Sequence, residues 1–155
     1  MKWITRERPK IDRIACPWLI QRFIDKEAEF LYVPSPDVMK TAKASGAIPY
    51  DVPGVELTHD GELCSFDAFL KKYPLKENLA LTRLAEIVRA ADTDTLSRSA
   101  QAPGLLAITL GLSANFPNDH EMLKIGMVMY DALYAWCRSM TGEKHGWYPN
   151  QIPMG

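Results

Sequence analysis

Apolar and polar residues follow a two-residue period in the first third of the chain, which is typical of short β-strands. Residues 2–6 (KWITR) and residues 28–33 (AEFLYV) show this pattern, and two prolines stop the second segment. A third strand is predicted at residues 55–59 (VELTH). We expect a turn at Asp60-Gly61 and a returning segment at residues 63–66 (LCSF).

Between these strands the apolar residues recur at helical spacing. Residues 14–24 (IACPWLIQRFI) predict a helix, provided that Pro17 lies in its first turn, where no N–H is needed. Residues 37–45 (DVMKTAKAS) predict a shorter helix that ends at Gly46, a residue type suited to a helix C-cap.

The second half of the chain has a helical pattern throughout. Amphipathic or apolar segments at residues 79–92 and 103–113 predict two helices, and residues 119–140 predict a long third one. Asn118 is its expected N-cap, with Glu121 completing a variant of the capping box. The long segment is apolar on more than one face, which is typical of a buried helix.

These elements together predict an α+β fold. A small mixed or parallel sheet with helices in the N-terminal half would pack on a helical C-terminal half. The length of 155 residues is sufficient for one domain with a proper core. We assign residues 1–140 to that domain and expect residues 141–155, rich in Gly and Pro, to form a loosely ordered tail.

Composition excludes several classes of function. The formal net charge is −1, so no global field favours nucleic acid or an acidic membrane. No apolar run is long enough to span a bilayer, and the N-terminus has no signal-peptide core. The three widely spaced cysteines favour free thiols in a cytoplasmic protein. The one basic stretch, residues 2–13, is short and lacks a nucleic-acid-binding motif.

Candidate chemistry concentrates in residues 51–67 (DVPGVELTHDGELCSFD). His59 would lie at a strand end beside a turn, with Asp51, Cys64 and Asp67 in the same segment. Imidazole, thiolate and carboxylate together suit a transition ion such as zinc or iron. The alternative is a plain surface hairpin with an exposed His59 and a buried Cys64.

Two residues of the helical half are further ligand candidates. Asp92 lies at the end of a predicted helix, where the helix dipole disfavours a carboxylate unless a cation compensates it. His120 lies in the first turn of the long helix, where a histidine has no such dipole explanation. The competing interpretations are a chain-turning Asp92 and a hydrogen-bonded structural His120.

The basic N-terminal stretch carries candidates for anion binding. Arg6 at a strand end and Arg13 at a helix start would direct charge and backbone donors toward one oxyanion, unless both are simply solvated. Cys16, near the predicted helix start, would be either an activated thiolate or an inward-facing core residue.

Four separate blocks of the chain resemble the chromate resistance protein family, and more specifically the C-terminal domain of ChrB-type proteins. They are TRERPKIDRIACPWLIQRFID, GAIPYDVPGVELTHDGELCSFD, VRAADTD and MYDALYAWCR. The resemblance runs from about Trp3 to Arg138. It implies a role in chromate resistance operons, where such proteins are chromate-responsive regulators of the efflux gene. DNA contact is expected from an additional N-terminal segment, so this chain would be a stand-alone version of the domain. Relatives joined to rhodanese-like modules imply a sulfurtransferase-type partner as an alternative.

A looser similarity concerns metal-dependent phosphoesterases of the DHH type. The matching positions would be Asp12, Asp51, His59 and Asp67, although the DHH triplet and the His-rich first loop are absent. This similarity concerns only the order of strands, loops and helices along the chain.

The resulting hypothesis is a cytoplasmic chromate-response protein that binds one zinc, iron or manganese ion, or a chromate-like oxyanion. The predicted metal ligands are His59, Asp51, Asp92 and His120, and the predicted anion-binding residues are Arg6 and Arg13. Cys64, a ligand or redox-active thiol, and Asp67 are the predicted catalytic groups. A sensor or binding module, a redox or hydrolytic metalloenzyme and a docking domain for a rhodanese-type protein all remain open.

Overall fold

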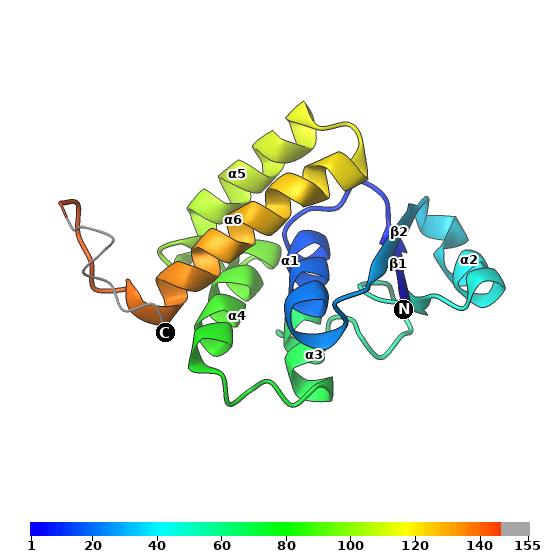
Figure 1. Ribbon diagram of the computed structural model, residues 1–155, viewed down its shortest axis with the longest axis horizontal. Coiled ribbons are helices and arrows are strands. Elements are labelled where there is room, and N and C mark those ends of the chain that lie inside the picture. Colours follow the sequence, from blue (N-terminus) through cyan, green and yellow to red (C-terminus); the bar gives the residue numbers. More distant parts are fainter. Residues whose placement is uncertain (147–155) are drawn as a thin grey trace.

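The computed structural model describes residues 1–146 and shows an α+β fold (Figure 1). A three-stranded parallel sheet lies at one end of the molecule, and a group of helices forms the remainder. The strands are β1 (Lys2–Arg6), β2 (Glu29–Val33) and β3 (Ile48–Pro49), in the order β2-β1-β3. The two longer strands agree with the predicted segments.

The third strand lies earlier in the sequence than predicted. Residues 55–59 form no strand, and Ile48–Pro49 pairs with β1 instead. After Pro49 the chain turns sharply, because Asp51 has a positive φ of 53° and its N–H donates to the carbonyl of Leu57. Residues 51–57 therefore form a closed loop rather than a sheet extension.

The turn at Asp60-Gly61 is confirmed, but the returning segment does not continue as a strand. Asp60 and Leu63 form an isolated antiparallel bridge, and helix α3 (Ser65–Lys72) begins two residues later. Cys64 and Asp67 form a capping box at its start, with the Asp67 carboxylate accepting from the N–H of Cys64 at 3.0 Å. This cap satisfies backbone N–H groups at the helix start, so it favours a helix over a strand for this segment.

Helix α1 (Asp12–Leu19) lies between the sheet and the helical half, and a π-helical turn, η1 (Ile20–Ile24), extends it. The helix begins two residues earlier than predicted, since the Ile11 carbonyl already accepts from the N–H of Ala15. Pro17 consequently lies inside the helix and not in its first turn, which corrects the prediction.

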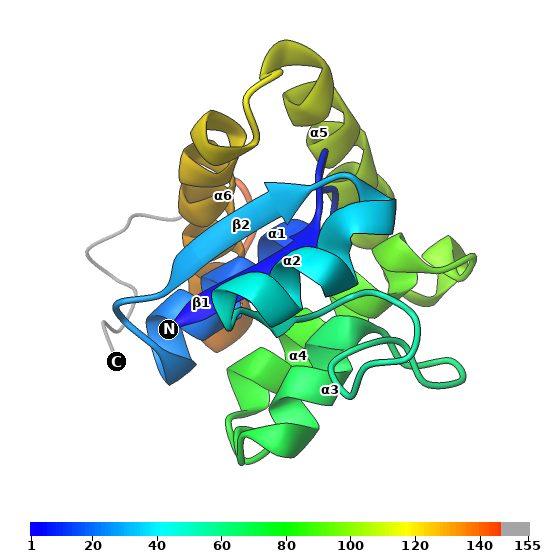
Figure 2. The same cartoon turned by 90° about the vertical axis from the view of Figure 1, so that its right-hand side faces the viewer.

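Helix α2 (Val38–Ser45) covers the face of the sheet opposite α1 (Figure 2). It follows a short 3-10 turn, η2 (Ser35–Asp37), and ends at Gly46, whose φ of 74° is the predicted left-handed C-cap. A small apolar core lies between α2 and the sheet, formed by Ile4, Val38, Ala42, Ala47 and Val52.

The main core lies between the other face of the sheet, α1 and the C-terminal helices. These are α4 (Leu79–Asp92), α5 (Ala102–Asn115) and α6 (Asp119–Ser139), with a 3-10 turn, η3 (Leu96–Arg98), after α4. The largest fully buried side chains of the molecule include Trp3, Trp18, Tyr50, Phe66, Phe69 and Tyr130.

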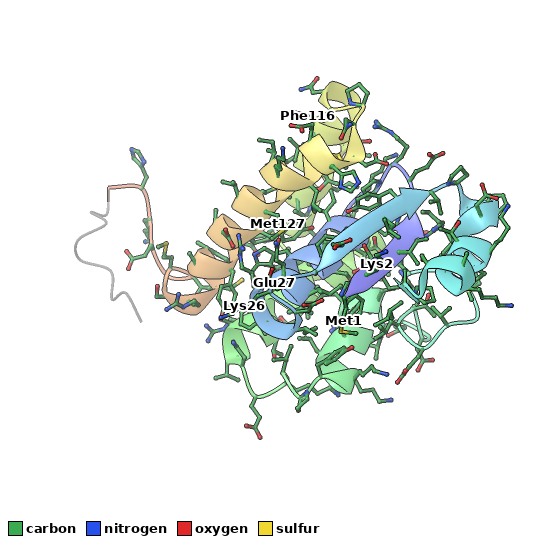
Figure 3. All side chains as sticks on the ribbon, turned by 45° about the vertical axis from the view of Figure 1, so that its right-hand side comes forward. Met1, Lys2, Lys26, Glu27, Phe116 and Met127 are labelled. Atoms are coloured by element: carbon green, nitrogen blue, oxygen red, sulfur yellow. The ribbon has the colours of Figure 1, made fainter. Side chains whose placement is uncertain are left out.

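Helices α5 and α6 form a hairpin with Phe116 near its tip, as Figure 3 shows. The predicted N-cap is confirmed, because the Asn118 side chain accepts from the N–H of Glu121 at 3.0 Å. The Glu121 side chain contacts Lys124, and within the described residues no capping box is formed at this helix. The expectation that α6 is buried on most sides is wrong. Ile125 and Val128 are 42% and 65% exposed, because α6 packs on its neighbours with one face only.

Within residues 1–146, no helix combines the length and the apolar character that a membrane crossing requires. The predicted loose tail begins at residue 141, where the helical elements have ended, and residues 147–155 of it lie outside the described part of the chain.

Candidate metal centre

One imidazole and two carboxylates from three separate segments converge between the sheet end and the helical half. His59 comes from the loop before α3, Asp12 from the first turn of α1 and Asp92 from the last turn of α4. The His59 Nε2 atom lies 2.9 Å from Asp92 Oδ2 and 3.6 Å from Asp12 Oδ2. One ligand atom from each of the three lies within 4.8 Å of the other two.

Asp12 is the most deeply buried of these three residues. Its side chain is almost fully inaccessible, and both oxygens accept from the N-terminus of α3: Oδ2 from the N–H of Ser65 at 2.7 Å, Oδ1 from the N–H of Phe66 at 3.0 Å. Burial, together with the charges of Asp92 and Asp51, nevertheless raises the pKa of Asp12 well above its usual value.

The backbone immediately before Asp12 is strained. Ile11 has a φ of 42°, a region that β-branched residues rarely occupy. The Ile11 carbonyl accepts from the buried hydroxyl of Tyr130 and from the N–H of Ala15. Residues held in such conformations concentrate at functional sites, and Ile11 immediately precedes Asp12.

Asp92 forms the second wall of the trio. Its Oδ1 accepts from the N–H of Asp12 at 3.4 Å, which ties the end of α4 to the start of α1. Burial and the charge of Asp51 raise the pKa of Asp92 to about 6, against the lowering influence of His59. A carboxylate with a raised pKa gains from any added cation.

Asp51 lies beside the trio and is already compensated. Its Oδ1 is 3.3 Å from His59 Nε2 and accepts from the Ser65 hydroxyl at 2.7 Å. Its Oδ2 accepts from Arg6 at 2.9 Å and lies 3.4 Å from Arg13 Nε.

Arg6 and Arg13, the two predicted anion-binding residues, do lie close together, because both pair with the carboxylate of Asp51. Arg13 also donates to the backbone carbonyls of Arg6 and Glu7. Burial and the neighbouring Arg6 charge lower the pKa of Arg13. An oxyanion would have to compete with Asp51 for both side chains.

The arrangement has the dimensions of a metal site. Two ligand atoms bound tetrahedrally at about 2.1 Å from one ion lie about 3.4 Å apart. The His59 Nε2 distances to its carboxylate neighbours fall around that value. Because His59 is 40% exposed, the site reaches solvent on the side of this residue.

The fourth predicted ligand, His120, lies elsewhere. It is exposed at the start of α6, where its ring packs edge-on against Tyr32 at a centroid distance of 5.3 Å. The group of close ligand atoms found among residues 1–146 contains Asp12 in its place.

The two predicted catalytic residues pair with each other and with α4. The Cys64 thiol lies 3.3 Å from Asp67 Oδ2, and Arg89 holds the Asp67 carboxylate with two hydrogen bonds of 2.9 and 2.6 Å. Burial, followed by the charges of Asp12 and Asp67, strongly raises the pKa of Cys64. This environment favours the thiol over the nucleophilic thiolate.

Cys16 is an inward-facing core residue, which was one of its two predicted interpretations. Its thiol donates to Asp12 Oδ1 at 3.3 Å inside the core, and burial raises its pKa well above the usual value. The principal residue that the ligand prediction missed is Asp12. It stands in a basic stretch, and only the DHH-type similarity pointed to it.

The comparisons with known proteins agree with the resemblance seen in the sequence. The family model for the ChrB C-terminal domain matches residues 3–137, a range that contains every residue of the trio. The chain is 36% identical over 135 residues to Protein ChrB of Cupriavidus metallidurans. This alignment covers 86% of the chain but 40% of that relative. No solved structure matches the chain significantly. The chain therefore belongs to the ChrB C-terminal domain family.

Proposed function

We propose that this domain binds one divalent transition-metal ion at Asp12, His59 and Asp92, and that it acts as a sensor or binding module in chromate resistance. The observation that carries the metal proposal is the convergence of one imidazole and two carboxylates from three segments within 4.8 Å. Exposed acidic groups gather at random on many surfaces, but Asp12 is buried in the core.

Charge supports the same proposal. Arg6 and Arg13 pair with Asp51, whereas the basic side chain that pairs with Asp12 and Asp92 within the described residues is His59. A neutral imidazole compensates neither carboxylate, and a protonated one compensates only one. A divalent ion would compensate both and would use the imidazole as a neutral ligand.

The three donor groups limit which metal ions fit the proposed site. Two carboxylates and one imidazole suit zinc, iron(II) or manganese, whereas a copper(I) site needs the sulfur ligands that are absent from this trio. Within that set we expect the solvent side, at His59, to hold water or an exogenous ligand.

Family membership supports the connection to chromate. ChrB-type proteins are associated with chromate resistance operons, and residues 3–137 of the chain match the family model of their C-terminal domain. The chain spans 40% of the ChrB protein that it matches. That this chain takes part in a regulatory activity of such a whole protein is therefore a part of the proposal.

A metal-dependent enzyme is the second candidate. It is favoured by the solvent access at His59, because a catalytic metal keeps a coordination position for water or substrate. The proposed sensor requires saturable metal binding without turnover, so an activity assay on the metal-loaded protein separates the two.

The test is elemental analysis of the untagged protein, purified in parallel as wild type, His59→Ala and His120→Ala. His120 is the matched control, since it is a histidine of the same chain outside the trio. We expect about one equivalent of metal in the wild type and in His120→Ala, and at least a tenfold loss in His59→Ala.

Equal metal content in all three proteins, or none in any of them after reconstitution with Zn²⁺, Fe²⁺ and Mn²⁺, would overturn the metal proposal. The loaded wild type is then incubated with a phosphodiester and, separately, with chromate together with NADH as the electron donor. Turnover that His59→Ala lacks would favour the enzyme. Binding of the ion without turnover would favour the sensor.

A further inference from the structure

A cavity lies beside the loop that carries His59. It encloses about 690 Å³ and is bounded by residues 56–63 of this loop, by α3 and by α4. Ligand pockets commonly have volumes of roughly 300–1,000 Å³, so the cavity has room for a small organic molecule.

This cavity is separate from the metal centre. Thr58 and Asp60, which flank His59 in the sequence, line it, whereas His59 itself and the other two members of the trio do not. Cys64 and Asp67 also line it, so the residues that the sequence marked as catalytic form its inner wall.

The walls of the cavity combine apolar surface with charge. Leu63, Ala68, Leu70 and Ala85 supply the apolar part. Two of its cations are already paired with lining carboxylates: Arg89 holds Asp67, and Lys72 contacts Glu56.

Two lysines of the lining remain without a partner. Within residues 1–146, Lys71 and Lys76 form no ion pair, and Asp60 is the lining carboxylate left to oppose them. The cavity therefore has a cationic excess beside its apolar walls. A ligand that matches this surface carries one negative head group and an apolar body.

We propose that this cavity is a binding site for a small amphiphilic anion, a carboxylate or a phosphate monoester with an apolar chain or ring. Its head group pairs with Lys71 and Lys76, and its body lies against Leu63, Ala68 and Ala85. None of the three proposed metal ligands lines the site, so the bound anion and the ion would occupy different places.

The experiment uses the full chain, labelled with ¹⁵N, and octanoate and octyl phosphate as probes below their aggregation concentrations. We expect saturable shifts of the backbone amides of Leu63, Ala68 and Ala85 with at least one of the two probes. Octylamine tests the sign of the head group, and inorganic phosphate tests the need for an apolar body. Both should bind at least about tenfold more weakly than the better probe.

Two variants test the proposed contacts. The double variant Lys71→Glu and Lys76→Glu should weaken binding by about tenfold or more, since it reverses both head-group partners. Lys43→Glu, an exposed substitution on α2 outside the lining, should leave binding unchanged. Ala68→Phe keeps every charge but fills the cavity, and it should also abolish the shifts.

The proposal fails if neither probe shifts these amides, or if octylamine binds as tightly as octanoate. It also fails if the shifts map to the exposed apolar residues Ile108 and Leu110 of α5, because the probe would then follow apolar surface alone. Unchanged binding in the folded double variant would equally overturn it.

Discussion

Asp12 and Asp92 are carboxylates in an environment that disfavours their charged forms. Burial raises the pKa of both, the charge of Asp51 raises both further, and the charge of Asp92 also raises the pKa of Asp12. The α3 N-terminus donates two backbone hydrogen bonds to Asp12, which makes its burial tolerable without removing the repulsion from Asp51 and Asp92. The metal-free protein therefore carries an electrostatic cost at this site.

This cost predicts the pH dependence of stability of the metal-free protein. Raising the Asp92 pKa from its ordinary 3.8 to about 6 corresponds to roughly 3 kcal/mol against the ionised form. A carboxyl with a raised folded-state pKa stabilises the fold at low pH, and that stabilisation is lost as pH rises through the folded-state pKa. We expect the free energy of unfolding to fall from about pH 4 to about pH 6 and to level off above that, measured by urea titration with EDTA present.

Asp92→Asn should flatten this pH profile, because an amide cannot ionise. Asp131→Asn is the matched control. Its hydrogen bond and ion pair with Arg22 lower the pKa of Asp131, so this residue is already ionised at pH 5, and its loss should leave the slope between pH 5 and pH 6 unchanged. A steeper fall in Asp92→Asn than in the wild type would contradict the assignment.

At the scale of elements, the close approach of α1 and α6 holds Asp12 in place. Gly126 of α6 faces Ile14 of α1, and a Cβ atom at this glycine would lie 2.4 Å from the Ile14 Cγ2 atom. Since Ile14 is fully buried and β-branched, it has little freedom to move away. The absence of a side chain at residue 126 therefore sets the distance between these two helices.

Gly126→Ala should destabilise the protein by about 1–3 kcal/mol, as expected for overpacking of a close-packed core. Gly111→Ala in α5 is the matched control, because its Cβ would meet nothing within 4 Å. That change should stabilise by roughly 0.5–1 kcal/mol through helix propensity. Equal unfolding midpoints for the two variants in urea would contradict the proposed packing role.

At the scale of the whole molecule, the proposed metal would connect the three parts of the fold. Asp12 belongs to the helix between the sheet and the C-terminal half, His59 to the loop that follows the sheet, and Asp92 to the helical half. The ligands come together only when all three parts are assembled. Metal binding to the native state is consequently coupled to global unfolding.

A bound ion should stabilise the wild type against global unfolding. At an ion concentration of 100 times Kd we expect an increase of about 2.7 kcal/mol in the free energy of unfolding. The increase should vanish in His59→Ala and persist in His120→Ala. Thermal or urea unfolding with and without Zn²⁺ or Mn²⁺ measures it, and an identical gain in His59→Ala would place the ion elsewhere.

The elements whose signals are local could be predicted from the amino-acid sequence. The period of apolar residues located β1, β2, α2, α4, α5 and α6, and Gly46 and Asn118 marked helix ends, because caps depend on a few neighbouring residues. The family and His59 as the centre of the candidate site also followed from local blocks. Sequence reasoning placed the third strand too late, because Ile48–Pro49 owes its strand character to pairing with β1 and not to its own pattern.

The tertiary structure alone decided which side chains meet. His59 follows Asp12 by 47 positions in the sequence, and Asp92 follows His59 by 33. No local sequence pattern relates residues that far apart. His120 was predicted as a ligand by residue type, but the fold turns it toward Tyr32. Cys64 was predicted as a reactive group by residue type, but burial at the α3 cap keeps its proton. Ligand geometry, burial and pKa depend on distances between segments, and these distances exist only once the core of α1, α3, α4 and α6 has packed.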